Sequence, residues 1–197
     1  MKGENAFAEV TLINGDRVFV NGSKGVSQNI VLDDEDYKFI SKFQLAHTSI
    51  YSGIEDLLPS IKKVNVKISY DFSNDYTDHH LDKALPHVDY AFFSGSDKRD
   101  DEVIKFIKEV RAYGAELVLV TRGSKGATLW YNNEYYNQGI VPTDVVDTLG
   151  AGDGFISRLL LGVLNKENIR ETLYHSAKEA ANVCTYYGAF GYGVDIK

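Results

Sequence analysis

Cysteine and proline are scarce in this chain of 197 residues. The single cysteine, Cys184, excludes an internal disulfide framework and a zinc site built from several cysteines. The three prolines (Pro59, Pro86 and Pro142) form no linker-like cluster, and no segment repeats with a period of about 20–50 residues. The sequence therefore predicts one compact unit rather than an array of modules.

Long apolar runs and an excess of positive charge are also absent. The leucine run at residues 159–161 ends at Gly162, far short of the roughly 20 residues that a membrane span needs. The first five residues lack the apolar stretch of a secretory signal. A net charge of −7 argues against a nucleic-acid surface, although local donors can still bind a phosphate group. We therefore expect a cytoplasmic protein with neither a membrane nor a nucleic-acid partner.

Short apolar runs alternate with helical patterns through the middle of the chain, and 44% of all residues are hydrophobic. This alternation predicts a mostly parallel sheet with helices on both faces, which is a three-layer α/β/α fold. The expected strands are residues 45–50, 64–72, 88–93 and 117–120, and the expected helices are 33–42, 54–63, 81–85 and one capped by Asp100 and stopped by Gly114.

Two β-hairpins flank this region. Residues 6–13 and 17–20 surround Asn14-Gly15-Asp16, and a polar loop is expected over residues 21–25. A second hairpin turns at Asn132-Asn133, between residues 128–131 and 134–137. We assign residues 1–25 to a lid-like β-hairpin and residues 26–197 to the α/β domain.

The segment Asp147–Gly154 carries the clearest chemistry. We predict a strand through Val146, then a helix over residues 151–164 and a last helix over residues 168–187. The first N–H groups of a helix lack acceptors and carry partial positive charge, so a start at Gly150-Ala151-Gly152 suits a phosphate group. Asp153 could then accept a proton from a hydroxyl group that attacks a phosphoryl group. The alternative is an ordinary helix start in which Asp153 only compensates the dipole.

Three segments resemble the ribokinase-like (PfkB-type) carbohydrate kinases. Asp-Thr-Leu-Gly-Ala-Gly-Asp at 147–153 resembles the C-terminal signature of that family, and residues 120–127 (VTRGSKGA) resemble its nucleotide loop. Gly188-Ala189 matches the closing Gly-Ala of the family. The resemblance runs in register from about Gly3 to Gly193, and within the family it is closest to fructoselysine 6-kinases.

The resemblance implies an ATP-dependent kinase that phosphorylates a hydroxyl group of a sugar or fructosamine. Asp153 would be the catalytic base, and the peptide N–H groups of Gly150, Ala151 and Gly152 would form the anion hole. The nucleotide would be held by Thr121, Gly123, Ser124, Lys125 and Gly126.

The resemblance also implies cations. The family's Asn-x-x-Glu motif falls on Ser94 and Asp97, of which Asp97 keeps a carboxylate for Mg²⁺. Asp147 matches the residue that anchors a monovalent cation such as K⁺. Two simpler interpretations stay open: Lys125 as a solvated loop lysine, and Asp147 as a cap of local N–H groups.

Part of the family pattern is missing. Neither the Gly-Asp strand nor the Gly-Gly-x-x-x-Asn sugar-binding motif is found, and residues 6–20 resemble the lid strands. The chain therefore corresponds to about the C-terminal two-thirds of a family member, which we expect to be an N-terminally truncated ribokinase-like fold. Exposed sheet edges would favour a homodimer. The alternatives are a nucleotide-binding protein without catalysis and a nucleoside kinase of the same fold.

Overall fold

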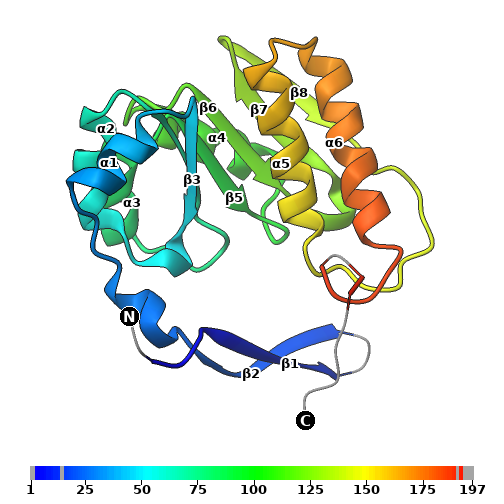
Figure 1. The fold of residues 1–197 in the computed structure, drawn as a ribbon. Coiled ribbons are helices and arrows are strands. Elements are labelled where there is room, and N and C mark those ends of the chain that lie inside the picture. The colour runs from blue at the N-terminus through cyan, green and yellow to red at the C-terminus, as the bar shows by residue number, and fades with distance from the viewer. Residues whose placement is uncertain (1–2, 14–15, 190, 193–197) are drawn as a thin grey trace.

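The computed structural model describes residues 3–13, 16–189 and 191–192 of the chain. Within this part, one sheet has the strand order β3-β4-β5-β6-β7-β8, and β1 and β2 form a separate antiparallel pair (Figure 1). Strands β3 to β6 are parallel to one another, whereas β7 and β8 are antiparallel. The strands are β1 (Phe7–Ile13), β2 (Asp16–Ser23), β3 (Leu45–Ser49), β4 (Lys67–Asp71), β5 (Tyr90–Ser94), β6 (Leu117–Thr121), β7 (Ala127–Tyr131) and β8 (Glu134–Gln138).

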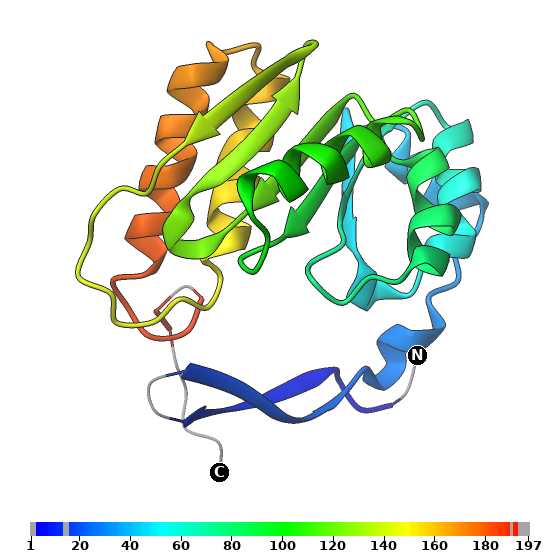
Figure 2. The same cartoon turned by 180° about the vertical axis from the view of Figure 1, so that it is seen from behind.

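Helices cover both faces of the six-stranded sheet. Helices α5 and α6 lie on the face that is turned toward the viewer in Figure 1, and α4 lies on the opposite face, which Figure 2 shows from behind. This is the three-layer α/β/α arrangement that the alternation predicted. The helices are α1 (Asp34–Ile40), α2 (Leu58–Lys63), α3 (Asp78–Ala84), α4 (Asp100–Arg111), α5 (Ala151–Leu164) and α6 (Ile169–Val183).

The central strands supply side chains to two apolar cores. In β5, Tyr90 and Phe92 pack toward α5 and α6, whereas Ala91 and Phe93 pack toward the helices on the other face. Successive residues of a strand point to opposite faces, so a strand between two helical layers must be apolar throughout. This requirement explains the continuous apolar run Leu117–Val120 in β6, all of which is buried.

The predicted strand through Val146 is wrong. After β8 the chain runs as an irregular loop to Gly150, and Val145 and Val146 are 62% and 44% exposed. The N–H groups of Val146 and Asp147 both donate to the carbonyl of Cys184, at the end of α6. Since these donors are satisfied there, the segment gains nothing by joining the sheet, and α5 begins from a loop.

Smaller departures from the sequence prediction have local causes. Pro59 does not interrupt a helix over 54–63, because a short 3₁₀ helix (Glu55–Leu57) ends there and α2 begins with Pro59 in its first turn. The cap of α4 is Arg99 rather than Asp100, since Glu102 accepts a hydrogen bond from the Arg99 N–H at 2.8 Å. The expected loop over 21–25 is partly strand, because β2 continues to Ser23.

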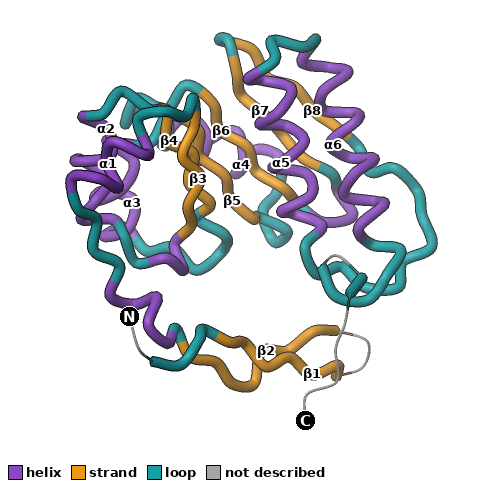
Figure 3. The backbone as a smooth tube through the Cα atoms, in the orientation of Figure 1, coloured by secondary structure: helices purple, strands orange, loops and turns teal. Residues whose placement is uncertain are grey.

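The hairpin of β1 and β2 lies beyond the end of the large sheet at which α5 begins (Figures 1 and 3). Its turn at Asn14-Gly15 lies outside the described residues, as does Gly193. The second hairpin turns as predicted, with Asn132 and Asn133 at φ of 50° and 63°. No helix of the described ranges is long and apolar enough to cross a membrane.

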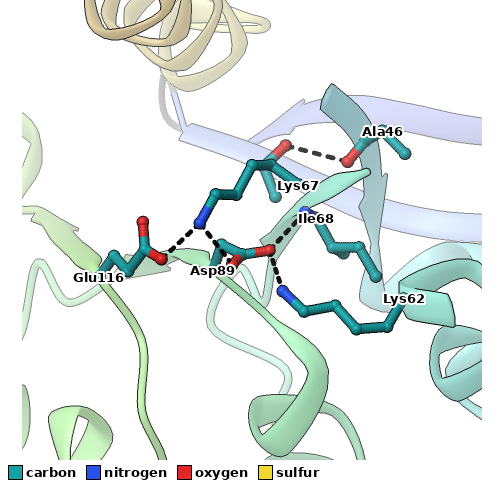
Figure 4. A network of polar contacts seen from close by, with 7 residues as sticks. Ala46, Lys62, Lys67, Ile68, Asp89 and Glu116 are labelled. Carbon is teal, nitrogen blue, oxygen red and sulfur yellow. Dashed lines mark hydrogen bonds and ion pairs between the residues drawn. The ribbon is translucent and has the colours of Figure 1, made fainter. Parts of the chain in front are cut away.

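A polar network ties the opposite end of the large sheet together (Figure 4). The nearly buried carboxylate of Asp89 accepts hydrogen bonds from Lys62 at 2.5 Å, from Lys67 at 3.1 Å and from the backbone N–H of Ile68 at 2.8 Å. Lys67 also pairs with Glu116. The network links the starts of β4, β5 and β6, far from the site described next.

Candidate active site

The carboxyl ends of three neighbouring strands form the floor of the candidate site. Asp71 ends β4, Ser94 ends β5 and Thr121 ends β6. Backbone hydrogen bonds join the loops that follow, from Ser94 N–H to the Ser73 carbonyl and from Gly95 N–H to the Thr121 carbonyl, both at 2.8 Å. The polar ends of the strands are thus held side by side, at the edge where α/β sheets bind ligands.

A hollow of about 180 Å³ opens above this floor. The first turn of α5 forms its other wall, so residues distant in the sequence meet around one space. Its lining residues are Asp71, Ser73, Phe92, Phe93, Ser94, Thr121, Gly152, Asp153 and Ile156.

The start of α5 has the geometry of an anion-binding turn. Gly150 has a φ of +79°, and a Cβ atom there would lie 2.6 Å from the Cβ of Ala189, so only glycine fits. The N–H groups of Gly150 and Gly152 donate to no acceptor in the described part of the chain, whereas that of Ala151 donates to the Thr148 carbonyl at 3.2 Å. Two donors at the positive end of a helix can therefore receive an anion.

Asp147 holds this turn in place from behind. Its carboxylate accepts hydrogen bonds from the N–H of Leu149 and from the N–H of Gly188, both at 2.9 Å. Asp147 is buried, and it does not line the hollow. These contacts do not test the predicted role of Asp147 as the anchor of a monovalent cation, which stays a proposal.

The predicted nucleotide loop follows β6 directly. It contains a 3₁₀ helix (Gly123–Lys125) and ends at Gly126, whose φ is +83° and where a Cβ atom would lie 2.1 Å from the Gln138 carbonyl oxygen. Lys125 Nζ donates to the Ser96 carbonyl at 3.0 Å, so the loop is attached to the segment that carries Asp97. Of the five predicted nucleotide residues, only Thr121 lines the hollow itself.

Two carboxylates, Asp71 and Asp153, line the same hollow. Burial raises the pKa of Asp71, and the charge of Asp153 adds to this, although the Ser73 N–H bond opposes it. Burial lowers the pKa of His47 on the neighbouring strand, against the charges of Asp71 and Asp153. Two neighbouring carboxylates disfavour an anion in the hollow, so a phosphate group there needs the α5 donors or a bound cation.

Ligands for a metal ion are sparse in the part of the chain that the structure describes. No group of three or more His, Cys, Asp or Glu side chains that could hold a metal occurs within the described residues. Asp97 is exposed in the loop after β5, beside Ser96. One carboxylate suits Mg²⁺, which commonly takes one or two protein ligands together with waters and substrate phosphates. The residues present therefore fit an ion that arrives with a nucleotide.

The segment Asp71-Phe72-Ser73-Asn74 lies at a strand end, where α/β folds bind ligands, so the sequence offered a polar role near the site as one interpretation without giving these residues a specific function. Asp71 follows a buried apolar strand, and Ser73 has a φ of +53°, which is unusual for a residue other than glycine. The strand-end position of the polar segment 71–74 was the available signal. Only the order of the strands shows that this segment faces Asp153.

Comparisons with known proteins give the family to which the sequence is similar. The model of the "pfkB family carbohydrate kinase" matches residues 47–192. The chain is 44% identical to the fructosamine kinase FrlD of Bacillus subtilis over 97% of the chain and 68% of that protein. It is 31% identical to the fructoselysine 6-kinase of Escherichia coli over 95% of the chain and 72% of that protein.

Solved structures show the same fold at lower identity. The ribokinase of Arabidopsis thaliana, complexed with ribose and ATP, aligns with a TM-score of 0.80 at 20% identity, covering 94% of this chain and 65% of that one. A nucleoside kinase of Burkholderia thailandensis in complex with inosine aligns with a TM-score of 0.74 at 16% identity, covering 95% and 63%. The chain thus spans less than two-thirds of these two structures.

Proposed function

The chain belongs to the pfkB family of carbohydrate kinases, and from this premise we propose that it transfers the γ-phosphoryl group of ATP to a hydroxyl group of a fructosamine or related sugar. One observation carries the proposal: Asp153, at a helix start with unpaired N–H groups, lines the same hollow as the end of β6, where the nucleotide loop begins. A base and an anion site side by side are what phosphoryl transfer to a hydroxyl group requires.

We assign the reaction steps to residues of the α5 turn. Asp153 accepts the proton of the acceptor hydroxyl group. At the same time the oxygen of that hydroxyl group bonds to the γ-phosphorus, and the bond between this phosphorus and the β-γ bridging oxygen breaks. The N–H groups of Gly150 and Gly152 stabilise the oxygens of the transferring group, with the Ala151 N–H joining them when it leaves Thr148. Removing one such donor typically costs about 10²–10³ in rate.

The loop over residues 121–126 is our proposed nucleotide site, with Lys125 contacting the phosphates. Gly123 and Gly126 have positive φ, which lets the backbone turn closely around a ligand. Asp97 would hold Mg²⁺ beside the phosphates, where the ion would offset their charge. Asp147 would anchor a K⁺ ion behind the turn. ATP as the phosphoryl donor places the proposed activity in the cytoplasm.

A fructosamine is the acceptor that the relatives favour, because the two curated relatives named above are fructosamine and fructoselysine kinases. A nucleoside acceptor is the second candidate, since a nucleoside kinase shares the fold. The third is nucleotide binding without transfer, because the chain spans 68% and 72% of the curated relatives.

The test compares wild type, Asp153→Asn and the control Asp144→Asn. Asp144 is an exposed aspartate in the loop before α5, and the hollow is not lined by it. ADP release is measured with fructoselysine, fructose, ribose and adenosine, and Mg²⁺–ATP affinity is measured by calorimetry. We expect fructoselysine-dependent release in wild type and Asp144→Asn, and a loss of about 10²–10⁴-fold in Asp153→Asn with nucleotide affinity retained.

Other outcomes separate the candidates. Turnover of adenosine without turnover of the sugars identifies a nucleoside kinase. If the protein binds the nucleotide but releases no ADP with any of the four acceptors, its function is nucleotide binding without phosphoryl transfer. Equal rates for wild type and Asp153→Asn would contradict the role of Asp153.

We propose that the hairpin over residues 1–25 acts as a lid and that two copies of the chain associate. The hairpin lies across the end of the sheet where α5 begins (Figure 1), and Phe7 and Val20 on it are half exposed. A free two-stranded hairpin is marginally stable, so a second copy would stabilise it. Sedimentation velocity checks the assembly, and a monomer at all concentrations would exclude it.

A further inference from the structure

Asp71 is a carboxylate in the hollow for which the proposed mechanism has no use. Its Oδ1 atom accepts a hydrogen bond from the Ser73 N–H at 2.8 Å, which closes a tight turn after β4. Its second carboxylate oxygen accepts no hydrogen bond from any described residue. One oxygen is thus committed to the fold, while the side chain as a whole lines the hollow with Asp153.

The turn that carries Asp71 is fixed by its neighbours. Ser73 has a φ of +53°, and the Tyr51 hydroxyl contacts Ser73 Oγ at 3.1 Å and donates to Asp75 at 2.8 Å. A residue other than glycine in this backbone region costs free energy, and such costs concentrate at functional sites. The loop therefore presents Asp71 in one orientation.

The strand order decides which substrate Asp71 can meet. Strand β5 lies between β4 and β6, so Asp71 and Thr121 stand on opposite sides of the hollow, with the nucleotide loop on the Thr121 side. A carboxylate repels phosphate oxygens but accepts hydrogen bonds from hydroxyl groups. Asp71 is thus on the side of the hollow away from the nucleotide loop, where the phosphoryl acceptor would bind.

We propose that Asp71 binds the phosphoryl acceptor, its second carboxylate oxygen accepting a hydrogen bond from a hydroxyl group other than the one that Asp153 deprotonates. The inference rests on the proposed function and assigns a specificity residue to it. Asp71 and Asp153 together would recognise two hydroxyl groups of one polyhydroxy acceptor, from a strand end and from a helix start. An acceptor with a single hydroxyl group would gain nothing from Asp71.

The variant Asp71→Asn tests the role of the second carboxylate oxygen separately from the role of the first. The amide oxygen of asparagine can still accept the Ser73 N–H bond, whereas the amide nitrogen replaces the free acceptor by a donor. The matched control is Asp75→Asn, in the same loop but outside the hollow, because the amide oxygen of asparagine can still accept the hydrogen bond from the Tyr51 hydroxyl. If Asp71→Asn does not fold, Asp71→Ser serves as the second variant, because a serine hydroxyl can also accept the bond that closes the turn.

Binding of fructoselysine is measured by calorimetry with Mg²⁺ and a non-hydrolysable ATP analogue, together with analogues that each lack one hydroxyl group. We expect the variant to bind fructoselysine about 10–100-fold more weakly, as for a hydrogen bond to a charged group. The nucleotide affinity of Asp71→Asn should stay within twofold of the wild-type value. The fructoselysine affinity of the control, Asp75→Asn, should do the same. For one deoxy analogue, wild type and variant should bind equally, which a purely structural role of Asp71 would not produce.

Four results would overturn the inference, and only the last of them also overturns the proposed function. Unchanged fructoselysine affinity in Asp71→Asn excludes the contact while the proposed kinase activity stands, provided that wild type releases ADP. A loss of nucleotide affinity instead places Asp71 on the donor side. Equal losses across all deoxy analogues show that Asp71 only maintains the turn. If wild type binds no acceptor and releases no ADP, the proposed function fails together with this inference.

Discussion

The carboxylate of Asp147 accepts a hydrogen bond from the peptide N–H of Gly188 at 2.9 Å and so joins the loop before α5 to the segment after α6. The same carboxylate holds the N–H of Leu149, one residue before Gly150. Ala189 then packs against Gly150 so closely that no side chain fits there. The glycine turn at the start of α5 is therefore shaped by Gly188 and Ala189, after α6, as well as by its own sequence.

Gly150→Ala should damage the turn. The φ of +79° costs a residue with a Cβ atom about 1–2 kcal/mol, and the contact with Ala189 adds to this. We expect Tm to fall by at least about 4 °C, with loss of ADP release. Gly139→Ala is the control, since it has negative φ and open space around its Cβ position. Wild-type stability of Gly150→Ala, measured by calorimetry, would contradict the tight fit.

Lys125→Met should weaken nucleotide binding if Lys125 contacts the phosphates. Loss of a charged hydrogen bond predicts an increase in the KM for ATP of about tenfold or more, with little change in the KM for the acceptor. Lys105→Met on the exposed face of α4 provides the control. Steady-state kinetics with both substrates measure the two KM values. An unchanged KM for ATP would mean that Lys125 is a solvated loop lysine whose contact is the Ser96 carbonyl.

Asp89→Asn should destabilise the fold without touching the site. Burial opposes ionisation of Asp89, but the bonds from Lys62, Ile68 N–H and Lys67 outweigh it and hold its pKa below the usual range. The stabilisation is thus complete above the ordinary pKa of aspartate and is lost as pH falls through the lower folded-state value. Urea unfolding should show a loss of about 2–3 kcal/mol near pH 7 that shrinks in acid. A loss that does not depend on pH would contradict the role of the charge.

Asp71→Asn should have the opposite effect on stability. Burial raises the pKa of Asp71, with a contribution from Asp153, so the folded protein binds the proton more tightly than the unfolded chain. The ionised group therefore destabilises the fold at pH values above its raised pKa, and this cost disappears as pH falls through that value. We expect Tm near neutral pH to rise by about 2–4 °C in the variant while acceptor affinity falls. A lower Tm than in wild type would show that Asp71 serves the fold.

Local patterns predicted most of the architecture. The buried run at Leu117–Val120, the turn at Asn132-Asn133 and the helix start at Gly150 depend on short-range periodicity and backbone preference, which neighbouring residues in the sequence determine. The same holds for the base at Asp153, since its place in the first turn of α5 follows from the glycine pattern. The buried strand, the turn and the helix start were confirmed in the structure, whereas the role of Asp153 as a base stays a prediction.

Val145 and Val146 show where such prediction ends. Their β-branched side chains favour a strand, but β8 forms the edge of the sheet and the Cys184 carbonyl takes the N–H of Val146, so the segment stays a loop. Likewise, nothing near Asp71 in the sequence indicates Asp153. By itself the sequence determined most of the elements and the glycine-lined start of α5, because both are local. Only the tertiary structure decided which strand ends share the hollow, because that depends on the order in which β4, β5 and β6 pair.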